Sequence, residues 1–352
     1  MSELSEHITS APVVILTGAG ASVPLGKPTT AQFVESIDGD QRREHGRVWS
    51  ELVRSCSDMW HTDLVDVEMI LQHVGDMLDL ADRVRRDYNL VAIADNAKSI
   101  CDRYRTIESQ LCEAVVERYS DVPPARATAL YKPLFKGLRA HPRTRTLPIF
   151  TLNYDLAVET AATRLSVPLV DGVRRGAPAR SRWSAAEFHR YAPRDELTVV
   201  LFKLHGSTTW AWGKDGSLVE LPSGTGKDPG AFRHALLYPY LSPKGLEREP
   251  FKTGYAYLAG CLGKAEVLLI VGTSLRDQHL VEVLRSVVAA NSGLQLLVVD
   301  PRVDAPALAA VLQAAPERIT GVNEGFSSKV ARALVRVIIG QVSRQDRDRG
   351  VA

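Results

Sequence analysis

Cysteine is scarce in this chain of 352 residues, which contains only Cys56, Cys101, Cys112 and Cys261. No two of them form a C-x-x-C pair, whereas a structural zinc site needs about four Cys or His ligands in paired spacing. We therefore expect no bound metal. Scattered cysteines are also typical of free thiols in a reducing compartment, so the composition predicts a cytoplasmic protein.

Long apolar runs and blocks of one charge are missing as well. No segment approaches the roughly 20 apolar residues that cross a bilayer, and residues 1–10 lack the basic start and apolar run of a secretory signal. The chain has 43 Lys and Arg against 41 Asp and Glu, and its basic runs, such as 83–86 and 174–175, are short. We therefore expect neither a membrane nor a nucleic acid among its direct partners.

The chain does contain a series of short apolar runs rich in β-branched residues. Val13–Thr17 stops at a glycine, which is the pattern of a buried parallel strand that leads into a tight turn. Further runs of this kind cover 147–152, 198–204, 267–271 and 296–299. Helical patterns follow several of them, among them 277–288 and 305–312. This alternation predicts an α/β fold with a Rossmann-like parallel sheet and helices on both faces.

The stretch between the first two strand runs has a helical pattern instead. Apolar residues recur every three or four positions from Val67 to Ala81 and again from Leu90 to Val115, and each set marks one face of a helix. A further helix is expected over about 125–138. We thus predict one domain over 1–342 and a polar tail at 343–352, the domain comprising a Rossmann core (about 12–39 and 146–340) and a helical insertion (about 40–145).

Two regions should lie over the core. The apolar face from Leu90 to Val115 covers the sheet in the reading we favour, and forms a seam between copies of the chain in the alternative. Residues 206–250 are rich in Gly, Pro and aromatic residues, which predicts irregular loops over a pocket. The aromatic residues of this region include Trp210, Trp212, Tyr238 and Tyr240.

A glycine-rich turn, 18–22, directly follows the first strand run. Glycines let the backbone approach a phosphate, and the helix after such a turn adds its N-terminal dipole. The fingerprint of dinucleotide-binding dehydrogenases places Gly or Ala where this chain has Val23. It also places an acid at the end of a second strand, whereas Asp38-Gly39-Asp40 has the composition of a turn. The turn therefore predicts a phosphate site, but not an ordinary NAD dehydrogenase.

Three further polar motifs each follow a strand run. They are Thr151-Leu152-Asn153-Tyr154-Asp155, Lys203-Leu204-His205-Gly206-Ser207 and Gly272-Thr273-Ser274-Leu275. All lie at the carboxyl ends of strands, where open α/β sheets bind ligands. As an ordered set, the glycine turn and these motifs resemble the sirtuin family, and within it a bacterial branch of sirtuin-like, NAD-consuming defence effectors.

The resemblance implies that the protein binds NAD as a substrate. Its glycine turn would hold the pyrophosphate, and residues after the later strands would contact the adenosine side. The positions that match the family's binding residues are Gly18, Ala19, Gly20, Ser22, Thr273, Ser274 and Asp300.

The resemblance also implies catalytic roles. Asn153 and Asp155 would contact the nicotinamide ribose and order the attacking water, and His205 would be the general base. Elementary chemistry agrees, because cleavage of the nicotinamide–ribose bond creates an oxocarbenium-like centre. Such a site needs a positioned nucleophile and a base whose pKa is near neutrality, and histidine suits that requirement best.

Two features of the family's protein deacylases are missing from this chain. Between Gly206 and Lys264 the only cysteine is Cys261, so the four-cysteine zinc module that follows the catalytic histidine is absent. The Pro-Asp-Phe-Arg sequence that follows the family's glycine turn is absent too, and 24–28 read Pro-Leu-Gly-Lys-Pro. Both departures weaken a deacylase interpretation.

We therefore predict an NAD hydrolase that releases nicotinamide and ADP-ribose, as a gated effector of bacterial antiphage defence. The alternatives are an NAD-dependent ADP-ribosyltransferase or deacylase of proteins, and a non-catalytic sensor of NAD or ADP-ribose. Unrestrained NAD hydrolysis would kill its host, so we expect control by a homo-oligomer or a separate protein. By family resemblance, that protein would be a HerA-like ATPase.

Overall fold

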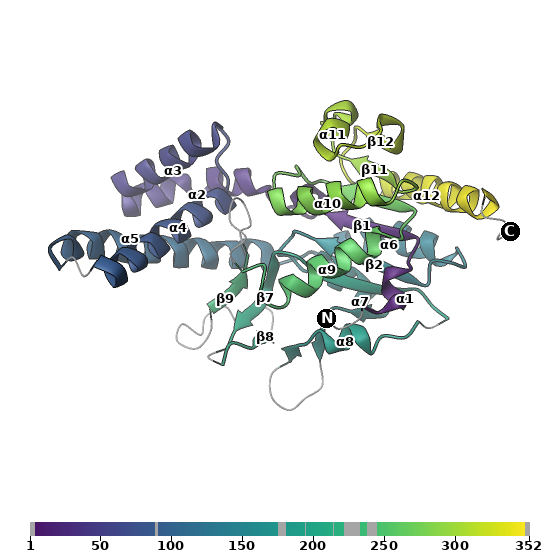
Figure 1. Ribbon diagram of the computed structural model, residues 1–352, viewed down its shortest axis with the longest axis horizontal. Helices are drawn as coiled ribbons and strands as arrows, with labels where there is room; N and C mark the ends of the chain where they lie inside the picture. The colour runs from purple at the N-terminus through teal and green to yellow at the C-terminus, as the bar shows by residue number, and fades with distance from the viewer. Residues whose placement is uncertain are drawn as a thin grey trace.

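The computed structural model describes residues 4–88, 91–174, 181–193, 195–213, 215–221, 233–237 and 245–348. At its centre is a parallel sheet of seven strands with the order β12-β11-β10-β1-β2-β6-β3 (Figure 1). The strands are Val13–Thr17 (β1), Thr146–Thr151 (β2), Leu169–Val170 (β3), Thr198–Lys203 (β6), Val267–Val271 (β10), Gln295–Val299 (β11) and Ile319–Val322 (β12). Helices cover both faces, so the predicted fold class is confirmed.

The strand runs recognised in the sequence form the central strands. Every residue of β1, β2, β6 and β10 is buried, as expected for strands covered on both faces. Thr17, at the end of β1, lies beside Val271 of β10 and Thr151 of β2, and Thr151 lies beside Lys203 of β6. The carboxyl ends of four strands therefore meet at one edge of the sheet.

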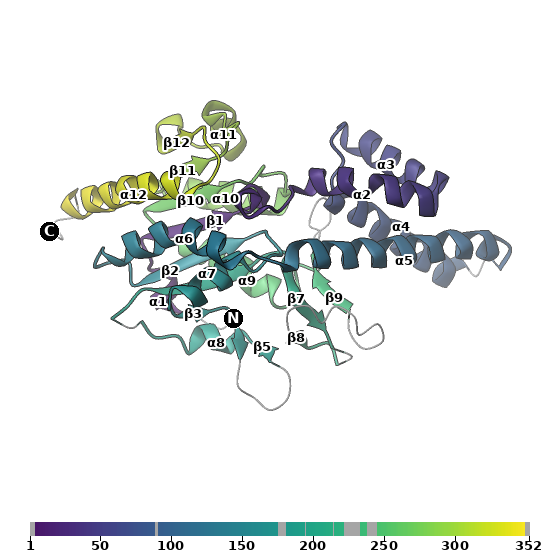
Figure 2. The same ribbon diagram turned by 180° about the vertical axis from the view of Figure 1, so that it is seen from behind.

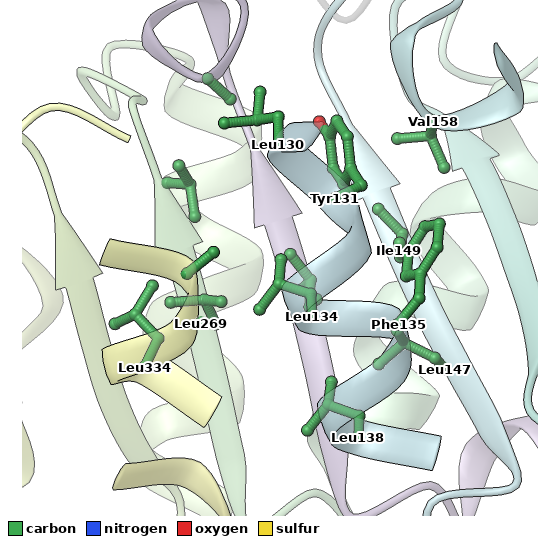
Figure 3. Close-up of a cluster of buried hydrophobic side chains, with 14 of the residues drawn as sticks. Leu130, Tyr131, Leu134, Phe135, Leu138, Leu147, Ile149, Val158, Leu269 and Leu334 are labelled. Carbon is green, nitrogen blue, oxygen red and sulfur yellow. The ribbon is translucent and has the colours of Figure 1, made fainter. Parts of the chain in front are cut away.

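One face of the sheet is covered by α6 (Pro124–Arg139), α7 (Ala157–Arg164) and α12 (Ser328–Asp348) (Figure 2). Leu134, Phe135 and Leu138 of α6 belong to the same hydrophobic core as Leu147 and Ile149 of β2, and Phe135 lies next to Ile149 (Figure 3). The sequence places α6 in the insertion, but its apolar face belongs to the core of the sheet.

The opposite face of the sheet packs against a second hydrophobic core. Its helices are α1 (Glu6–Thr9), α8 (Ala186–His189), α9 (Phe251–Leu262), α10 (Gln278–Ala290) and α11 (Ala305–Leu312). Side chains of β1 alternate between the two cores, with Val13 and Ile15 in one and Val14 and Leu16 in the other. Each strand thus contributes to both layers, as its period of two requires.

Four helices form a body of their own beside the sheet (Figures 1 and 2). They are α2 (Thr30–His45), α3 (Arg47–Trp60), α4 (Val67–Tyr88) and α5 (Val91–Ser120), and their apolar faces form a third hydrophobic core, to which Tyr154 after β2 also belongs. Ile107, Leu111 and Val115 are fully buried in that core, whereas Ile100 is 51% exposed. The expectation that this apolar stripe covers the sheet is therefore wrong, although its first residue, Leu90, lies outside the described residues.

A second, antiparallel sheet has the order β4-β5-β8-β7-β9, and three of its strands (β7, β8 and β9) lie within 206–250, where the sequence predicts irregular loops. Its strands are Val173–Arg174 (β4), Arg182–Trp183 (β5), Gly206–Trp212 (β7), Leu218–Glu220 (β8) and Arg233–Leu236 (β9). Trp210 is buried in a small core of this sheet, and Trp212 packs against the same core. These two aromatic residues therefore stabilise the sheet, while Tyr238 and Tyr240 lie outside the described residues.

Two local expectations differ from the structure. Asp38-Gly39-Asp40 is not a turn but part of α2, where Asp38 accepts hydrogen bonds from Arg42 Nε (2.6 Å) and Trp49 Nε1 (2.8 Å). α12 continues to Asp348, so most of the expected polar tail is helical. Within the part of the chain that the structure describes, no helix combines the length and apolarity that a membrane crossing requires.

Candidate active site

A pocket of about 230 Å³ lies at the carboxyl edge of the parallel sheet. All ten residues that the sequence assigns to NAD binding or catalysis line it: Gly18, Ala19, Gly20, Ser22, Asn153, Asp155, His205, Thr273, Ser274 and Asp300. They follow five different strands and are up to 282 positions apart, counted from Gly18 to Asp300. They lie together in one pocket because the carboxyl ends of these parallel strands are adjacent in the sheet.

The glycine turn after β1 lies against the turn after β10. A Cβ on Gly20 would be 2.7 Å from Gly272 Cα, and one on Gly18 would be 2.7 Å from Thr273 Cβ. Gly272 has a φ of +60°, in the left-handed region that favours glycine. The close approach of the two turns therefore requires these glycines before any ligand is considered.

No α-helix starts directly after the glycine turn, contrary to expectation. The turn continues into two single 3-10 turns, η1 (Ala19–Ala21) and η2 (Val23–Leu25). The first α-helix after them, α2, begins at Thr30, and its N-cap Thr29 and Thr30 both line the pocket. The positive helix end at the pocket thus belongs to α2.

Asn153 is tied to the glycine turn through its side-chain amide. Its Nδ2 donates to the Gly18 carbonyl (2.9 Å) and to Ser22 Oγ (3.0 Å), which uses both of its N–H groups. Ser22 Oγ donates to Asp155 Oδ2 (2.6 Å), and Asp155 Oδ1 accepts from the Ala157 N–H (2.9 Å) at the start of α7. Asp155 therefore anchors this network, and the amide oxygen of Asn153 is left to accept a hydrogen bond from a ligand or water.

The chain segment that carries His205 is fixed on both sides. Before it, the buried Lys203 donates to the Asp155 carbonyl and lies 3.1 Å from Glu159 Oε1. After it, Gly206 has a φ of +98°, and a Cβ there would overlap with the Ala235 carbonyl oxygen of β9. These contacts fix the position of His205 in the short junction between β6 and β7.

The His205 ring is only 2% exposed and lies between two carboxylates. Its Nε2 is 3.2 Å from Asp277 Oδ2, and its Nδ1 is 3.6 Å from Glu68 Oε1. Burial opposes the charged ring, but the hydrogen bond with Asp277 and the negative charges of Asp277 and Glu68 outweigh it and raise the pKa of His205 to about 9. The expectation of a base with a pKa near neutrality is therefore wrong for the unliganded protein, in which the ring is an imidazolium at pH 7.

Sequence reasoning missed both carboxylates that hold this ring. Asp277 follows the motif at 272–275 and caps α10, accepting the Leu280 N–H (3.0 Å) through Oδ1, while its Oδ2 accepts from the Tyr255 hydroxyl (2.9 Å). Its place just after the end of β10 is the signal that could have found it. Glu68 lies in the first turn of α4, and no local pattern connects the insertion with the site.

Two charged residues lie beside this arrangement in the pocket lining. Asp66 is buried and caps α4 by accepting the Met69 N–H (3.0 Å), and it lies 3.9 Å from Arg276 Nη1. Burial and then the nearby charge of Glu68 raise the pKa of Asp66 to about 6.

Across the described ranges, no group of three or more His, Cys, Asp or Glu is placed to hold a metal ion. The predicted lack of zinc stays a prediction.

Residues 148–318 match the SIR2-like domain. The matched segment runs from β2 to the 3-10 turn η3 (Pro316–Arg318) and contains Asn153, His205 and Thr273, whereas the glycine turn and the helical insertion lie outside it.

Several solved structures are similar over nearly the whole chain. One is a point mutant of a Sir2 homologue in complex with ADP-ribose, with 15% identity over 96% of this chain and 98% of that chain and a TM-score of 0.45. Another is Sir2Tm bound to a propionylated peptide, with 14% identity over 92% of each chain and a TM-score of 0.41. A third is Sir2 with a p53 peptide and NAD+, with 13% identity over 97% of this chain and 94% of that chain and a TM-score of 0.39. No curated protein matches the chain significantly.

Proposed function

We propose that the protein is an NAD glycohydrolase, which cleaves the nicotinamide–ribose bond and releases nicotinamide and ADP-ribose. The observation that carries this proposal is the meeting of three groups in one pocket: a glycine turn, an asparagine whose amide oxygen is left to accept a hydrogen bond, and a histidine. The SIR2-like match across three of the strand-end motifs supports it.

In this proposal NAD lies along the edge of the sheet. Its pyrophosphate lies over the glycine turn, 18–22, near the N-terminus of α2, since the positive end of a helix favours an anion. Thr273, Ser274 and Asp300, which line the side of the pocket formed by β10 and β11, hold the adenosine part.

The hydrolytic step uses Asn153 and His205. The Asn153 oxygen orients a water molecule toward the anomeric carbon of the nicotinamide ribose. The carbon–nitrogen bond breaks, its electron pair neutralises the pyridinium ring of the leaving nicotinamide, and the water oxygen forms the new bond to that carbon. A neutral His205 takes the proton that the water loses.

This mechanism implies a strong pH dependence. Since the pKa of His205 is about 9, about one ring in a hundred is neutral at pH 7 in the unliganded protein. NAD hydrolysis should therefore become faster as the pH rises toward 9.

The proposal includes gating of the activity. The pocket volume of about 230 Å³ is below the roughly 300–1,000 Å³ of pockets that enclose drug-sized ligands, and a dinucleotide needs more room. We infer that the pocket widens as NAD enters. We propose that assembly into a homo-oligomer or contact with a separate regulatory protein, such as a HerA-like ATPase, widens it, as suits an effector of antiphage defence.

The test is to incubate the purified protein with NAD at pH 9 over a range of protein concentrations and to separate the products by chromatography. Equimolar nicotinamide and ADP-ribose are expected, with loss of both in Asn153→Ala but not in the matched variant Asn323→Ala, whose asparagine is exposed. Transfer of ADP-ribose to protein would show a transferase instead. NAD binding without nicotinamide release at any concentration would show a sensor, and either result would overturn the proposal.

A further inference from the structure

We infer that Glu68 is a positioning residue that holds the His205 ring opposite Asp277, and that through it the helical insertion controls the base of the site. The contact is independent of any reaction, whereas its consequence for catalysis rests on the proposed NAD hydrolysis.

Glu68 reaches the pocket from outside the Rossmann core. It lies in the first turn of α4, its side chain is 18% exposed, and Oε1 is 3.6 Å from His205 Nδ1 and 3.1 Å from the Tyr154 hydroxyl. The buried Asp66 caps α4 by accepting the Met69 N–H (3.0 Å), so that Glu68 moves together with the first turn of the helix. The position of Glu68 therefore depends on how the insertion is seated.

The ring faces charged or titratable groups from several elements. Glu68 comes from α4 and Asp277 from the N-cap of α10, where Tyr255 of α9 donates to Asp277. Tyr154, which follows β2, contacts Glu68, and Asp66 and Arg276 line the same pocket. Nε2 of the ring is hydrogen-bonded to Asp277, whereas Nδ1 faces Glu68 at 3.6 Å and has no hydrogen-bond partner among the described residues.

This placement favours one form of the ring. A neutral imidazole has one N–H and one nitrogen lone pair, so between Glu68 and Asp277 it would turn a lone pair toward a carboxylate oxygen. Only the imidazolium presents a proton to both carboxylates. For His205 to take a proton from water, one of the two carboxylates must withdraw.

Glu68 is the carboxylate that can withdraw. Asp277 is fixed by the Leu280 N–H and the Tyr255 hydroxyl, on helices that pack on the sheet. Among the described residues, the Glu68 carboxylate accepts a hydrogen bond from the Tyr154 hydroxyl alone, and α4 packs in the core that the insertion shares with Tyr154. A shift of α4 therefore releases His205 while the sheet stays in place.

The direct test is an NMR titration of the imidazole nitrogens of the full chain, with the His205 signals assigned by their loss in His205→Gln. In Glu68→Gln, the titration midpoint of His205 should fall by about 1–3 units, the usual effect of removing an opposite charge at this distance. The matched control, Glu35→Gln, removes an exposed carboxylate of α2 and should leave the midpoint unchanged. Glu68→Ala serves as a second variant if Glu68→Gln does not fold.

The kinetic test follows kcat/KM for NAD against pH in the same variants. In Glu68→Gln the rising part of the kcat/KM profile should move to lower pH. For each unit by which the pKa of His205 falls, kcat/KM at pH 7 should rise about tenfold relative to its maximum at high pH. A merely structural role would lower kcat/KM at every pH and leave the pH of half-maximal activity unchanged. An unchanged NMR midpoint in Glu68→Gln and Glu68→Ala would overturn the inference. A lowered midpoint in a protein that never cleaves NAD would instead uphold the contact and refute the proposed function.

Discussion

Replacing His205 with glutamine should remove a large pH-dependent part of the stability of the fold. The folded ring has a pKa of about 9, against an ordinary value near 6.5 in an unfolded chain. Because the folded pKa is the higher one, the stabilisation is fully present below pH 6.5 and is lost as the pH rises through 9. The ring is 2% exposed, so solvent does not screen its two carboxylate contacts.

The size of the effect follows from the shift. The pKa of His205 is about 2.5 higher in the folded protein than in the unfolded chain, which corresponds to about 3 kcal/mol in the free energy of unfolding. Burial alone would raise the pKa of Asp277, but the hydrogen bond and the charge of His205 outweigh burial and lower it. This shift reports the same interaction from the side of Asp277, so its free energy must not be added to that of His205. It also acts in a different window, since a depressed carboxyl pKa loses its contribution only as the pH falls into the acidic range.

The assay is urea unfolding at pH 6.5 and pH 10, followed by the fluorescence of buried tryptophans such as Trp49 and Trp210. The loss of unfolding free energy between the two pH values should be about 3 kcal/mol larger in the wild type than in His205→Gln. Subtracting the two proteins cancels other groups that titrate in this range, and coincident circular dichroism curves would check two-state behaviour. Parallel pH dependences in the two proteins would refute the carboxylate clamp around His205.

Four further outcomes are expected. Asn153→Ala should lower nicotinamide release by about 10²–10⁴-fold through lost positioning of the water, and a wild-type rate would contradict the site. Gly20→Ala should lower the free energy of unfolding by about 1–3 kcal/mol, because its Cβ would lie 2.7 Å from Gly272 Cα, while Gly325→Ala, which meets open space, should cost little. Elemental analysis should find no stoichiometric zinc, and chelators should neither unfold nor inhibit the protein; one tightly bound zinc per chain would revive a deacylase. Light scattering should show an oligomer whose specific NADase activity rises with concentration, and a monomer with constant turnover would argue against gating by self-assembly.

The sheet and much of the pocket lining could be predicted from the sequence because both follow from short-range patterns. Continuous apolar runs such as Val13–Thr17 predict buried parallel strands, and polar residues after such runs necessarily meet at one edge. Asn153, His205 and Thr273 were therefore predictable as neighbours. Asp277 obeys the same rule and lies only two residues beyond the motif that was recognised.

The parts that could not be predicted depend on what each element packs against. Periodicity identifies the apolar face of α5, but it does not say whether Leu111 faces the sheet or another helix. Nor does it show that Glu68 of α4 enters a pocket built by the sheet, because that contact joins residues 137 positions apart. The pKa of His205 depends on this same contact, which is why a base near neutrality was the wrong expectation.

Because the hydrophobic core of α2–α5 is distinct from the two cores of the sheet, we expect these helices to form a second cooperative unit that opens while the sheet remains closed. Amide protons of Ile70 and Val74 would then exchange with solvent through openings that leave those of Ile15 and Leu269 protected. Each such opening would carry the first turn of α4, with Glu68, away from His205. Hydrogen exchange in one helix and the ring's proton affinity would thus report a single equilibrium, and an activator that loosens the insertion would change both together.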